Sequence, residues 1–298
     1  MSLPTDGPGS RDGLVIVDKE SGWTSHDVVA RMRRIAGTRR VGHAGTLDPM
    51  ATGLLLLGIG RATRLLGYLS NKSKTYEATI RLGAATITDD AEGEVIAQCT
   101  PAELAAVTDI EIYRSIAAFR GEIQQRPSSV SAIKIDGVRS YTRVRAGDEV
   151  VLPERAVTIY RCDAKILTRT STYIDLMATI ECSSGTYIRA LARDLGIALG
   201  VGGHLTSLRR TVIDSFTLES ARKIDQFEED FTFMPMVEVA RLIFPVRMIT
   251  GQERQVLSHG GKLAPSEIDE VVAAIFEESL IALVQNRSDG AKPLAVFA

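Results

Sequence analysis

One aspartate stands at an unusual junction between a loop of small residues and an apolar segment. Asp48 lies in GHAGTLDPMATG (residues 42–53), and LLLLGIG (54–60) follows directly. A carboxylate at the edge of a hydrophobic core is poorly hydrated, and such a group can act as a nucleophile or as a general base. The simpler alternative is that Asp48 only caps the turn that Pro49 favours.

The residue types around this aspartate favour a chemical role over a purely structural one. Much of the loop consists of small residues, so another backbone or a ligand can approach it closely. Burial without a neighbouring cation would protonate Asp48, so a reactive carboxylate here needs a positive partner. Arg189, in SGTYIRALARDLG (184–196), lies off the leucine stripe of that segment and is a candidate for this partner. The alternative is that Arg189 is an ordinary surface arginine.

The usual sequence signatures of metal-dependent and cofactor-dependent enzymes are missing from the chain. It has no phosphate-binding P-loop, no GxGxxG dinucleotide loop, no HExxH and no GxSxG motif. The four histidines have no i, i+4 pairing, and the three cysteines fit neither a disulfide framework nor a metal site. No apolar run reaches the roughly 18 to 20 residues of a membrane span. We therefore predict a cytoplasmic protein that does not bind a membrane and whose reaction needs neither a metal ion nor a cofactor.

Charge is distributed unevenly along the chain, although the formal net charge is only −2. Residues 1–224 carry 29 Lys and Arg against 25 Asp and Glu, whereas residues 225–298 carry 6 against 12. The segment 31–40 holds five arginines and no acid, and the segment 120–147 holds six basic residues and two acids. Such local basic patches suit a polyanion such as RNA. The alternative is a solvated helix face with ordinary surface arginines.

The elements around the Asp48 loop follow from local patterns. Residues 13–19 form a short apolar run that is typical of a buried strand. A helix is predicted next, because Thr24 and Asp27 have the spacing of a capping box ahead of an apolar stripe with a period of 3.6. Residues 74–83 alternate between polar and apolar side chains, which predicts a half-buried strand with Tyr76 facing inward.

The rest of the chain mixes helices and strands without a regular βαβ repeat. Residues 100–121 and 184–200 have helical patterns, and 173–182 is a predicted strand. The stretch 124–157 has no clear period and reads as a basic loop or insertion, and the acidic stretch 225–230 marks a boundary. This order predicts an α+β fold rather than a doubly wound one.

The Asp48 stretch closely resembles the catalytic motif of the TruB family of tRNA pseudouridine synthases. Further matches to the family follow in the family's own order along residues 13 to 210. They are GWTS (22–25), KTYE (74–77), GAATITDDAEG (83–93), SSGTYIRALARDLG (183–196) and GGHLTSLRR (202–210).

The resemblance implies the isomerisation of uridine to pseudouridine at position 55, in the T arm of tRNA, without a cofactor. Asp48 would be the catalytic aspartate and would pair with Arg189. Tyr76 would stack on a target base that has been flipped out of the RNA. Sequence leaves open whether the carboxylate attacks the base, attacks the sugar or removes a sugar proton.

The resemblance also implies a set of substrate-binding residues. Tyr187 and Leu208 would line the base pocket, and His43 would take the place that the flipped base vacates. Lys19 falls at the family's N-terminal motif, which usually reads Lys-Pro-x-Gly, whereas Glu20 stands here in place of the proline. Thr46 is expected to contribute to binding from the Asp48 loop.

The fold that the resemblance implies is a mixed, largely antiparallel central sheet flanked by helices, followed by a small β-rich PUA-like domain. The expected organisation is a disordered tail (1–12), a catalytic domain (13–230) with an RNA-clamping insertion (about 124–153), and the PUA-like domain (231–298). A net charge of −6 over residues 225–298 is unusual for an RNA-binding module. The expected state is a monomer without an obligate protein partner.

Two other functions remain open at this point. The chain could bind or fold RNA without catalysis, with Asp48 only as a turn cap. It could also be a synthase of the same fold that acts on ribosomal or messenger RNA, because target choice would depend on the insertion and the C-terminal module.

Overall fold

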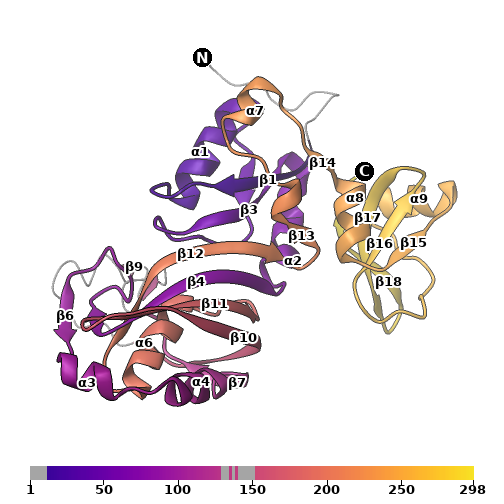
Figure 1. Cartoon of the computed structure of the whole chain (residues 1–298). Helices are drawn as coiled ribbons and strands as arrows, with labels where there is room; N and C mark the ends of the chain where they lie inside the picture. The colour runs from indigo at the N-terminus through magenta and orange to yellow at the C-terminus, as the bar shows by residue number, and fades with distance from the viewer. Residues whose placement is uncertain (1–11, 129–133, 136–137, 140–151) are drawn as a thin grey trace. The chain divides into compact units, whose positions relative to one another are not determined.

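The computed structural model describes residues 12–128, 134–135, 138–139 and 152–298 (Figure 1). The predicted tail lies outside this range apart from Asp12, and so does most of the predicted insertion. The chain forms two compact units. The first comprises the residues up to 48 together with 54–70 and 215–298, and the second comprises 49–53 and 71–214.

The second unit is built on an antiparallel sheet in the order β12-β4-β11-β10-β7. Thr52 and Gly53 add a parallel pairing, to Arg209 and Arg210 of β12, so the sheet is mixed and largely antiparallel, as predicted. The strands are β4 (Lys74–Leu82), β7 (Gly121–Gln125), β10 (Arg155–Arg169), β11 (Ile174–Cys182) and β12 (Gly203–Ile213).

Helices cover one face of this sheet (Figure 1). Helix α6 (Ile188–Ala198) packs on β12 and β4, and α4 (Asp109–Ala117) packs on β10. The single helical region predicted over 100–121 is divided, because Thr108 starts a second capping box directly after α3 (Pro101–Ala106). Two small hairpins complete the described part of the unit. They are β5 (Ala84–Thr86) with β6 (Val95–Gln98), and β8 (Lys134–Ile135) with β9 (Val138–Arg139).

The first unit places the Asp48 loop between two paired strands. Strand β1 (Gly13–Lys19) lies between β14 (Met234–Pro235) and β3 (Thr52–Ile59), and β2 (Val41–His43) pairs with β3. Helix α1 (Ser25–Ala36) has the predicted capping box between Thr24 and Asp27, and Gly37 ends it in the left-handed conformation. The segment after β3 forms two short helices, η1 (Gly60–Leu65) and α2 (Leu66–Ser70).

The C-terminal part of the first unit contains a small sheet of its own, in the order β15-β16-β17-β18. This sheet has its own cluster of buried apolar side chains, so the predicted small β-rich module is present. Its strands are β15 (Val246–Met248), β16 (Val272–Phe276), β17 (Ser279–Arg287) and β18 (Gly290–Val296).

Short elements lead into this module and interrupt it. They are β13 (Phe216–Thr217), η2 (Leu218–Ser220), α7 (Gln226–Glu229), α8 (Met236–Ile243) and α9 (Gly251–Ser258). Across the described ranges, every helix is too short or too polar for a membrane span.

Backbone contact between α6 and β12 fixes the helix on the sheet. A Cβ atom at Gly196 would lie 2.1 Å from the amide nitrogen of Gly203, and a Cβ atom at Gly203 would lie 2.4 Å from the carbonyl oxygen of Ala192. Only glycine allows so close an approach, and the neighbouring backbone cannot move aside as a flexible side chain can.

We predict that Gly196→Ala lowers the free energy of unfolding by about 1–3 kcal/mol or more, because the new methyl group overpacks the α6–β12 contact. Gly67→Ala in α2 is the matched control, since nothing lies within 4 Å of a Cβ atom there. The control is expected to be neutral or stabilising by up to about 1 kcal/mol. Urea unfolding measures both variants, and equal midpoints would contradict the proposed contact.

Candidate active site

The loop that carries Asp48 is anchored by a buried serine of α1. The Ser25 hydroxyl donates to the carbonyl oxygen of Leu47 at 3.1 Å, and the Leu47 amide donates to the same hydroxyl oxygen at 2.8 Å. Leu47 and its neighbours Ala44 and Ala51 are buried, whereas Asp48 itself is half-buried. The loop therefore holds a carboxylate at the edge of the core, as its sequence predicted.

The end of the loop requires glycine. Gly53 has a φ of +99°, and a Cβ atom there would lie 2.2 Å from the carbonyl oxygen of Arg210 in β12. A side chain at this position would meet both backbone strain and a backbone clash. Gly53 thus allows the first residues of β3 to lie directly against β12.

Three other predicted site residues lie with Asp48 in the first unit. His43 is half-buried at the end of β2, and its ring meets that of His26 edge-on at 5.6 Å between centroids. Thr46 is exposed on the loop. Lys19 is completely buried and donates to the carbonyl oxygens of Glu20 and Trp23 at 3.0 and 2.7 Å. Lys19 therefore stabilises the turn before α1, and a contact with substrate stays a prediction.

Tyr76 and Leu208 share the inward face of the sheet in the second unit. Tyr76 is only 7% exposed. In the register between β4 and β12, Tyr76 lies opposite Arg210, and Ala78 lies opposite Leu208, two positions along the same strands. This register makes the two side chains diagonal neighbours on one face. The alternation in 74–83 had predicted that Tyr76 faces inward, and the structure confirms it.

Arg189 is not a surface arginine, because only 6% of its side chain is exposed. One guanidinium nitrogen lies 3.3 Å from Oδ2 of Asp90, and it also donates to the carbonyl oxygen of Thr88 at 2.9 Å. Asp90 was missed by the sequence reasoning, although it lies within the recognised motif 83–93. Its pairing with Arg189 is a buried ion pair, in which each charge compensates the desolvation of the other.

The turn that presents Asp90 is tightly bonded. Oδ1 of Asp90 accepts from the Thr88 hydroxyl at 2.5 Å and from the Glu92 amide at 3.1 Å, and the Thr86 hydroxyl donates to the Asp90 carbonyl oxygen at 2.7 Å. The Leu205 amide of β12 donates to the carbonyl oxygen of Asp89 at 3.0 Å. These bonds fix the carboxylate before Arg189 meets it.

Tyr187 begins helix α6 and is held through its backbone. The side-chain amide of Gln125, which is fully buried, donates to the carbonyl oxygen of Tyr187 at 3.0 Å and accepts from its amide at 2.8 Å. The Arg155 guanidinium lies 4.7 Å from the centre of the Tyr187 ring. Sequence gave no local signal for the role of Gln125, since its partner is 62 residues away.

The predicted site residues thus divide between the units. Tyr76, Leu208, Tyr187 and Arg189 lie in the second unit, while Asp48 and the other predicted residues lie in the first. The pairing of Asp48 with Arg189 stays a prediction.

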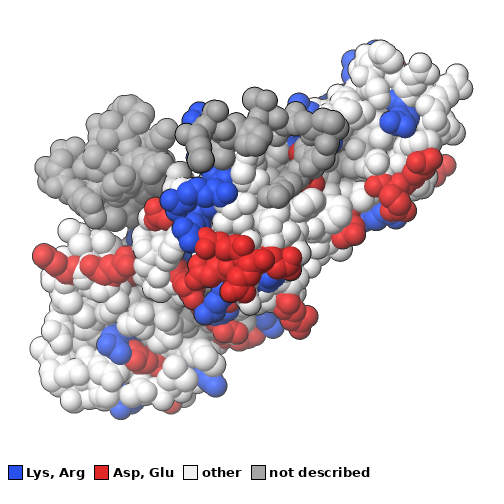
Figure 2. Space-filling view, turned by 90° about the horizontal axis from the view of Figure 1, so that it is seen from above, with Lys and Arg blue, Asp and Glu red and all other residues white. Residues whose placement is uncertain are grey.

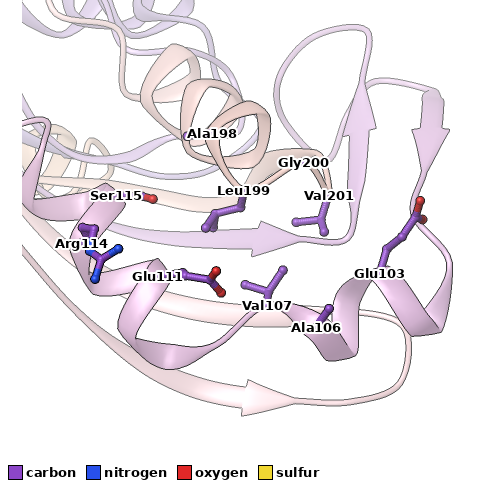
Figure 3. Close-up of a pocket in the computed structure, with 10 residues that line it drawn as sticks. All are labelled: Glu103, Ala106, Val107, Glu111, Arg114, Ser115, Ala198, Leu199, Gly200 and Val201. Carbon is purple, nitrogen blue, oxygen red and sulfur yellow. The ribbon is translucent and has the colours of Figure 1, made fainter.

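A pocket of about 470 Å³ opens elsewhere in the second unit, between the α3–α4 segment and the C-terminal end of α6 (Figure 3). None of the predicted site residues lines it. Its acids Glu103 and Glu111 each accept hydrogen bonds from a threonine that caps a helix, so both have structural roles. The pocket therefore lacks the residues expected around a target base.

In the described part of the chain, His, Cys, Asp and Glu side chains form no group of three or more that could hold a metal ion.

Solved structures with the same fold define the class of the protein. The chain aligns with a TM-score of 0.69 and 25% identity to a structure described as a Cbf5-Nop10-Gar1 complex, over 96% of this chain and 85% of that one. The similarity covers nearly the whole chain, and the fold is that of the pseudouridine synthases.

Sequence comparisons define the family. Residues 33–188 match the model of the TruB family pseudouridylate synthase N-terminal domain, residues 189–248 match the tRNA pseudouridylate synthase B C-terminal domain, and residues 244–298 match the tRNA pseudouridine synthase II C-terminal domain. The chain belongs to the TruB family of pseudouridine synthases, which are isomerases.

Similar proteins span the full length of the chain. One from Arthrobacter sp. (strain FB24) is 53% identical and one from Paenarthrobacter aurescens (strain TC1) is 54% identical. Each alignment covers 96% of this chain, with 96% and 95% of the respective relative. Both relatives are named tRNA pseudouridine synthase B.

We predict that Gln125→Met lowers the free energy of unfolding by about 1–3 kcal/mol, because it leaves the backbone groups of Tyr187 without their side-chain partner. Gln124→Met is the matched control, since Gln124 is exposed at the neighbouring position. Thermal unfolding of the two variants measures the difference. Equal midpoints would show that Gln125 does not hold the start of α6.

Proposed function

We propose that this protein converts uridine 55 in the T arm of tRNA to pseudouridine, with Asp48 as the catalytic carboxylate. Identity above 50% to full-length tRNA pseudouridine synthases supports tRNA as the substrate. The motif around Asp48, which resembles the family's catalytic motif, supports the assignment of that residue.

The reaction is an isomerisation of the nucleoside. The glycosidic bond moves from N1 to C5 of the uracil, and the nucleoside gains and loses no atoms overall. The N1–C1′ bond of the nucleoside breaks, the uracil turns, and C5 bonds to C1′ while the proton on C5 is lost and N1 gains one. No electrons are gained or lost overall, so a carboxylate that adds to the base or sugar, or removes a sugar proton, is chemically sufficient.

The single observation that carries the proposal is the anchoring of the Asp48 loop. The two hydrogen bonds between Ser25 and Leu47 fix the residue directly before the aspartate, and both groups are buried. A reactive group is most effective when its geometry is set before the substrate arrives. Asp48 follows this fixed residue and is itself partly exposed.

Tyr76 is the proposed platform for the flipped uracil. A base within a folded RNA loop is out of reach of a carboxylate, so it must leave its stack. Stacking on an aromatic ring is worth about 1–3 kcal/mol per base, which offsets much of the few kcal/mol that unstacking costs. The almost complete burial of Tyr76 keeps its ring in one orientation for this contact.

Arg189 is proposed to keep Asp48 ionised next to the base. Asp90 and the carbonyl oxygen of Thr88 hold one terminal nitrogen of its guanidinium. The resemblance of SGTYIRALARDLG to the family motif supports the pairing of Arg189 with Asp48.

Basic surface supports RNA as the ligand. Figure 2 shows one group of Lys and Arg side chains on the face in view, directly beside a larger group of Asp and Glu side chains. Arg34, Arg39 and Arg40 at the end of α1 are exposed, and within the described ranges no carboxylate lies at ion-pair distance from them.

We assign residues 13–230 to catalysis and residues 231–298 to a PUA-like module. The proposed protein is a cytoplasmic monomer.

We predict that Asp48→Asn lowers the rate of pseudouridine formation in tRNA transcripts by at least about 10³-fold, the scale seen when a nucleophile is removed. The amide keeps the shape and much of the hydrogen bonding of the carboxylate, so tRNA binding is expected to persist. Release of tritium from 5-³H-uridine in the T arm measures the rate.

The control for this experiment is Asp163→Asn, because Asp163 is an exposed aspartate of β10 paired with Arg120. Its rate is expected to match that of the unaltered protein. Near-normal turnover by Asp48→Asn would overturn the catalytic assignment and favour a turn-capping role.

We predict that Tyr76→Phe keeps tRNA affinity within about threefold, because the ring still stacks on the base. A fall in kcat at constant affinity would give the hydroxyl a role in proton transfer. Tyr160→Phe is the control, since Tyr160 is 57% exposed on β10. A large loss of affinity in Tyr76→Phe would contradict the stacking role.

A further inference from the structure

One arginine at the start of β10 is partly withdrawn from water without meeting a carboxylate. Arg155 is half-buried, and one terminal nitrogen of its guanidinium, Nη2, is fully buried without a hydrogen-bond partner. Among the described residues, no carboxylate lies at ion-pair distance from it. A cation that has lost part of its hydration is costly unless an opposite charge or hydrogen-bond acceptors replace the water. The described part of the protein therefore leaves the charge of Arg155 uncompensated.

Three other arginines of the second unit that are partly or fully buried each meet a carboxylate. Arg81, Arg189 and Arg193 lie 2.7, 3.3 and 3.2 Å from an aspartate oxygen. Arg155 departs from this pattern. Buried polar groups without a partner are rare in folded proteins, and each one requires an explanation, such as a bound ligand.

The position of the Arg155 side chain is fixed by Tyr187, the residue directly before α6. The guanidinium carbon lies 4.7 Å from the centre of the tyrosine ring. Gln125 lies opposite Arg155 in the register of β7 and β10, and it holds the backbone of the same tyrosine through two hydrogen bonds. The face of an aromatic ring attracts a cation but carries no net charge. Tyr187 therefore orients the guanidinium and does not replace an anion.

The guanidinium can be approached from the side of Gly185. This glycine is exposed, and a Cβ atom built on it would meet only Nη1 of Arg155 among the described residues beyond its chain neighbours, at 3.7 Å. The space beside Nη1 is therefore open on that side. A guanidinium presents its N–H donors in a plane that matches the oxygens of a phosphate.

We propose that Arg155 is a substrate-binding residue that donates to a phosphate of the tRNA backbone close to the target nucleotide. Tyr187, on whose ring the guanidinium lies, is two positions before Arg189 of the candidate active site. A phosphate bound at Arg155 is therefore one of the T loop, beside the flipped base. This inference rests on the proposed function, because tRNA supplies the phosphate.

Arg155→Met tests the contact through the salt dependence of binding. Methionine keeps an apolar side chain on the Tyr187 ring and removes the charge. The Kd for a T-arm stem-loop is expected to rise about tenfold, and the slope of log Kd against log salt is expected to fall by about 0.7–0.9, the change for one lost phosphate contact. The value of kcat at saturating tRNA is expected to stay within about twofold, because the contact binds RNA and takes no part in breaking bonds.

Two further variants are the controls. Arg155→Lys keeps the charge and loses the planar donor group, so the salt slope is expected to match that of the unaltered protein while Kd rises less than in Arg155→Met. Arg161→Met removes an arginine of the same strand that is paired with Asp163, and it is expected to leave Kd and the slope unchanged. Thermal unfolding shows whether each variant is folded at the assay temperature.

Neutral methylphosphonate linkages locate the phosphate. Each phosphate of the T loop is replaced in turn, and binding is measured for the unaltered protein and for Arg155→Met. At one position near uridine 55, the neutral linkage is expected to weaken binding of the unaltered protein about tenfold and binding of the variant less than about twofold, because the two changes remove the same contact.

Three results would overturn the inference. An unchanged Kd with an unchanged slope would mean that Arg155 does not meet the RNA, and a higher Kd with an unchanged slope would mean that it only supports Tyr187. A methylphosphonate series in which no T-loop position depends on Arg155 would contradict the assigned phosphate. A failure of the proposed function is distinct, because there the unaltered protein binds the T arm and leaves uridine 55 unmodified, and the binding measurements require no turnover.

Discussion

A buried guanidinium requires a carboxylate close by, and in this protein the buried guanidinium of Arg189 meets Asp90. Its side chain is 6% exposed and that of Asp90 is 4% exposed, so neither charge is stabilised mainly by solvent. Desolvation costs several kcal/mol for each ion, and removing one partner of such a pair typically costs about 3–5 kcal/mol. Helix α6 and the turn at Asp90 therefore depend on each other.

The same constraint explains why hydrogen bonds and close packing fix the backbone of the surrounding segments. The Asp90 turn is bonded to β12 through Leu205, and Gly196 lets α6 lie directly against that strand. Buried side chains with two bonds each, Gln125 and Ser25, fix the start of α6 and the residue before Asp48. Side chains with no proposed part in the reaction, such as Gln125 and Ser25, thus hold the segments that carry the proposed reactive residues.

Local patterns in the sequence predicted the elements that have a regular burial pattern. The alternation over 74–83 gave β4 and the direction of Tyr76, and the Thr24 capping box gave the start of α1. Strand β10 was not predicted, because most of its residues are at least partly exposed and two register shifts interrupt its alternation. The division of α3 from α4 was also missed, although Thr108 offers a capping-box signal.

The site could be predicted only where a motif marked it. Asp48, Tyr76 and Arg189 lie in recognised stretches; the structure bears out the inward direction of Tyr76 and excludes the alternative that Arg189 is an ordinary surface arginine. Asp90 and Gln125 act through partners 62 or more residues away, and no local period encodes such a distance. Such long-range polar pairs can be identified only when the fold of the chain is known, because no local sequence pattern marks them.

A crystal structure of this protein with a T-arm stem-loop of tRNA would test the central claim most directly. We predict that uridine 55 is flipped out of the loop and stacked on Tyr76. The Asp48 carboxylate is expected to lie within about 3–3.5 Å of the base or its sugar, the separation of a near-attack geometry. A uridine that stays stacked in the RNA, or that contacts neither side chain, would contradict the account.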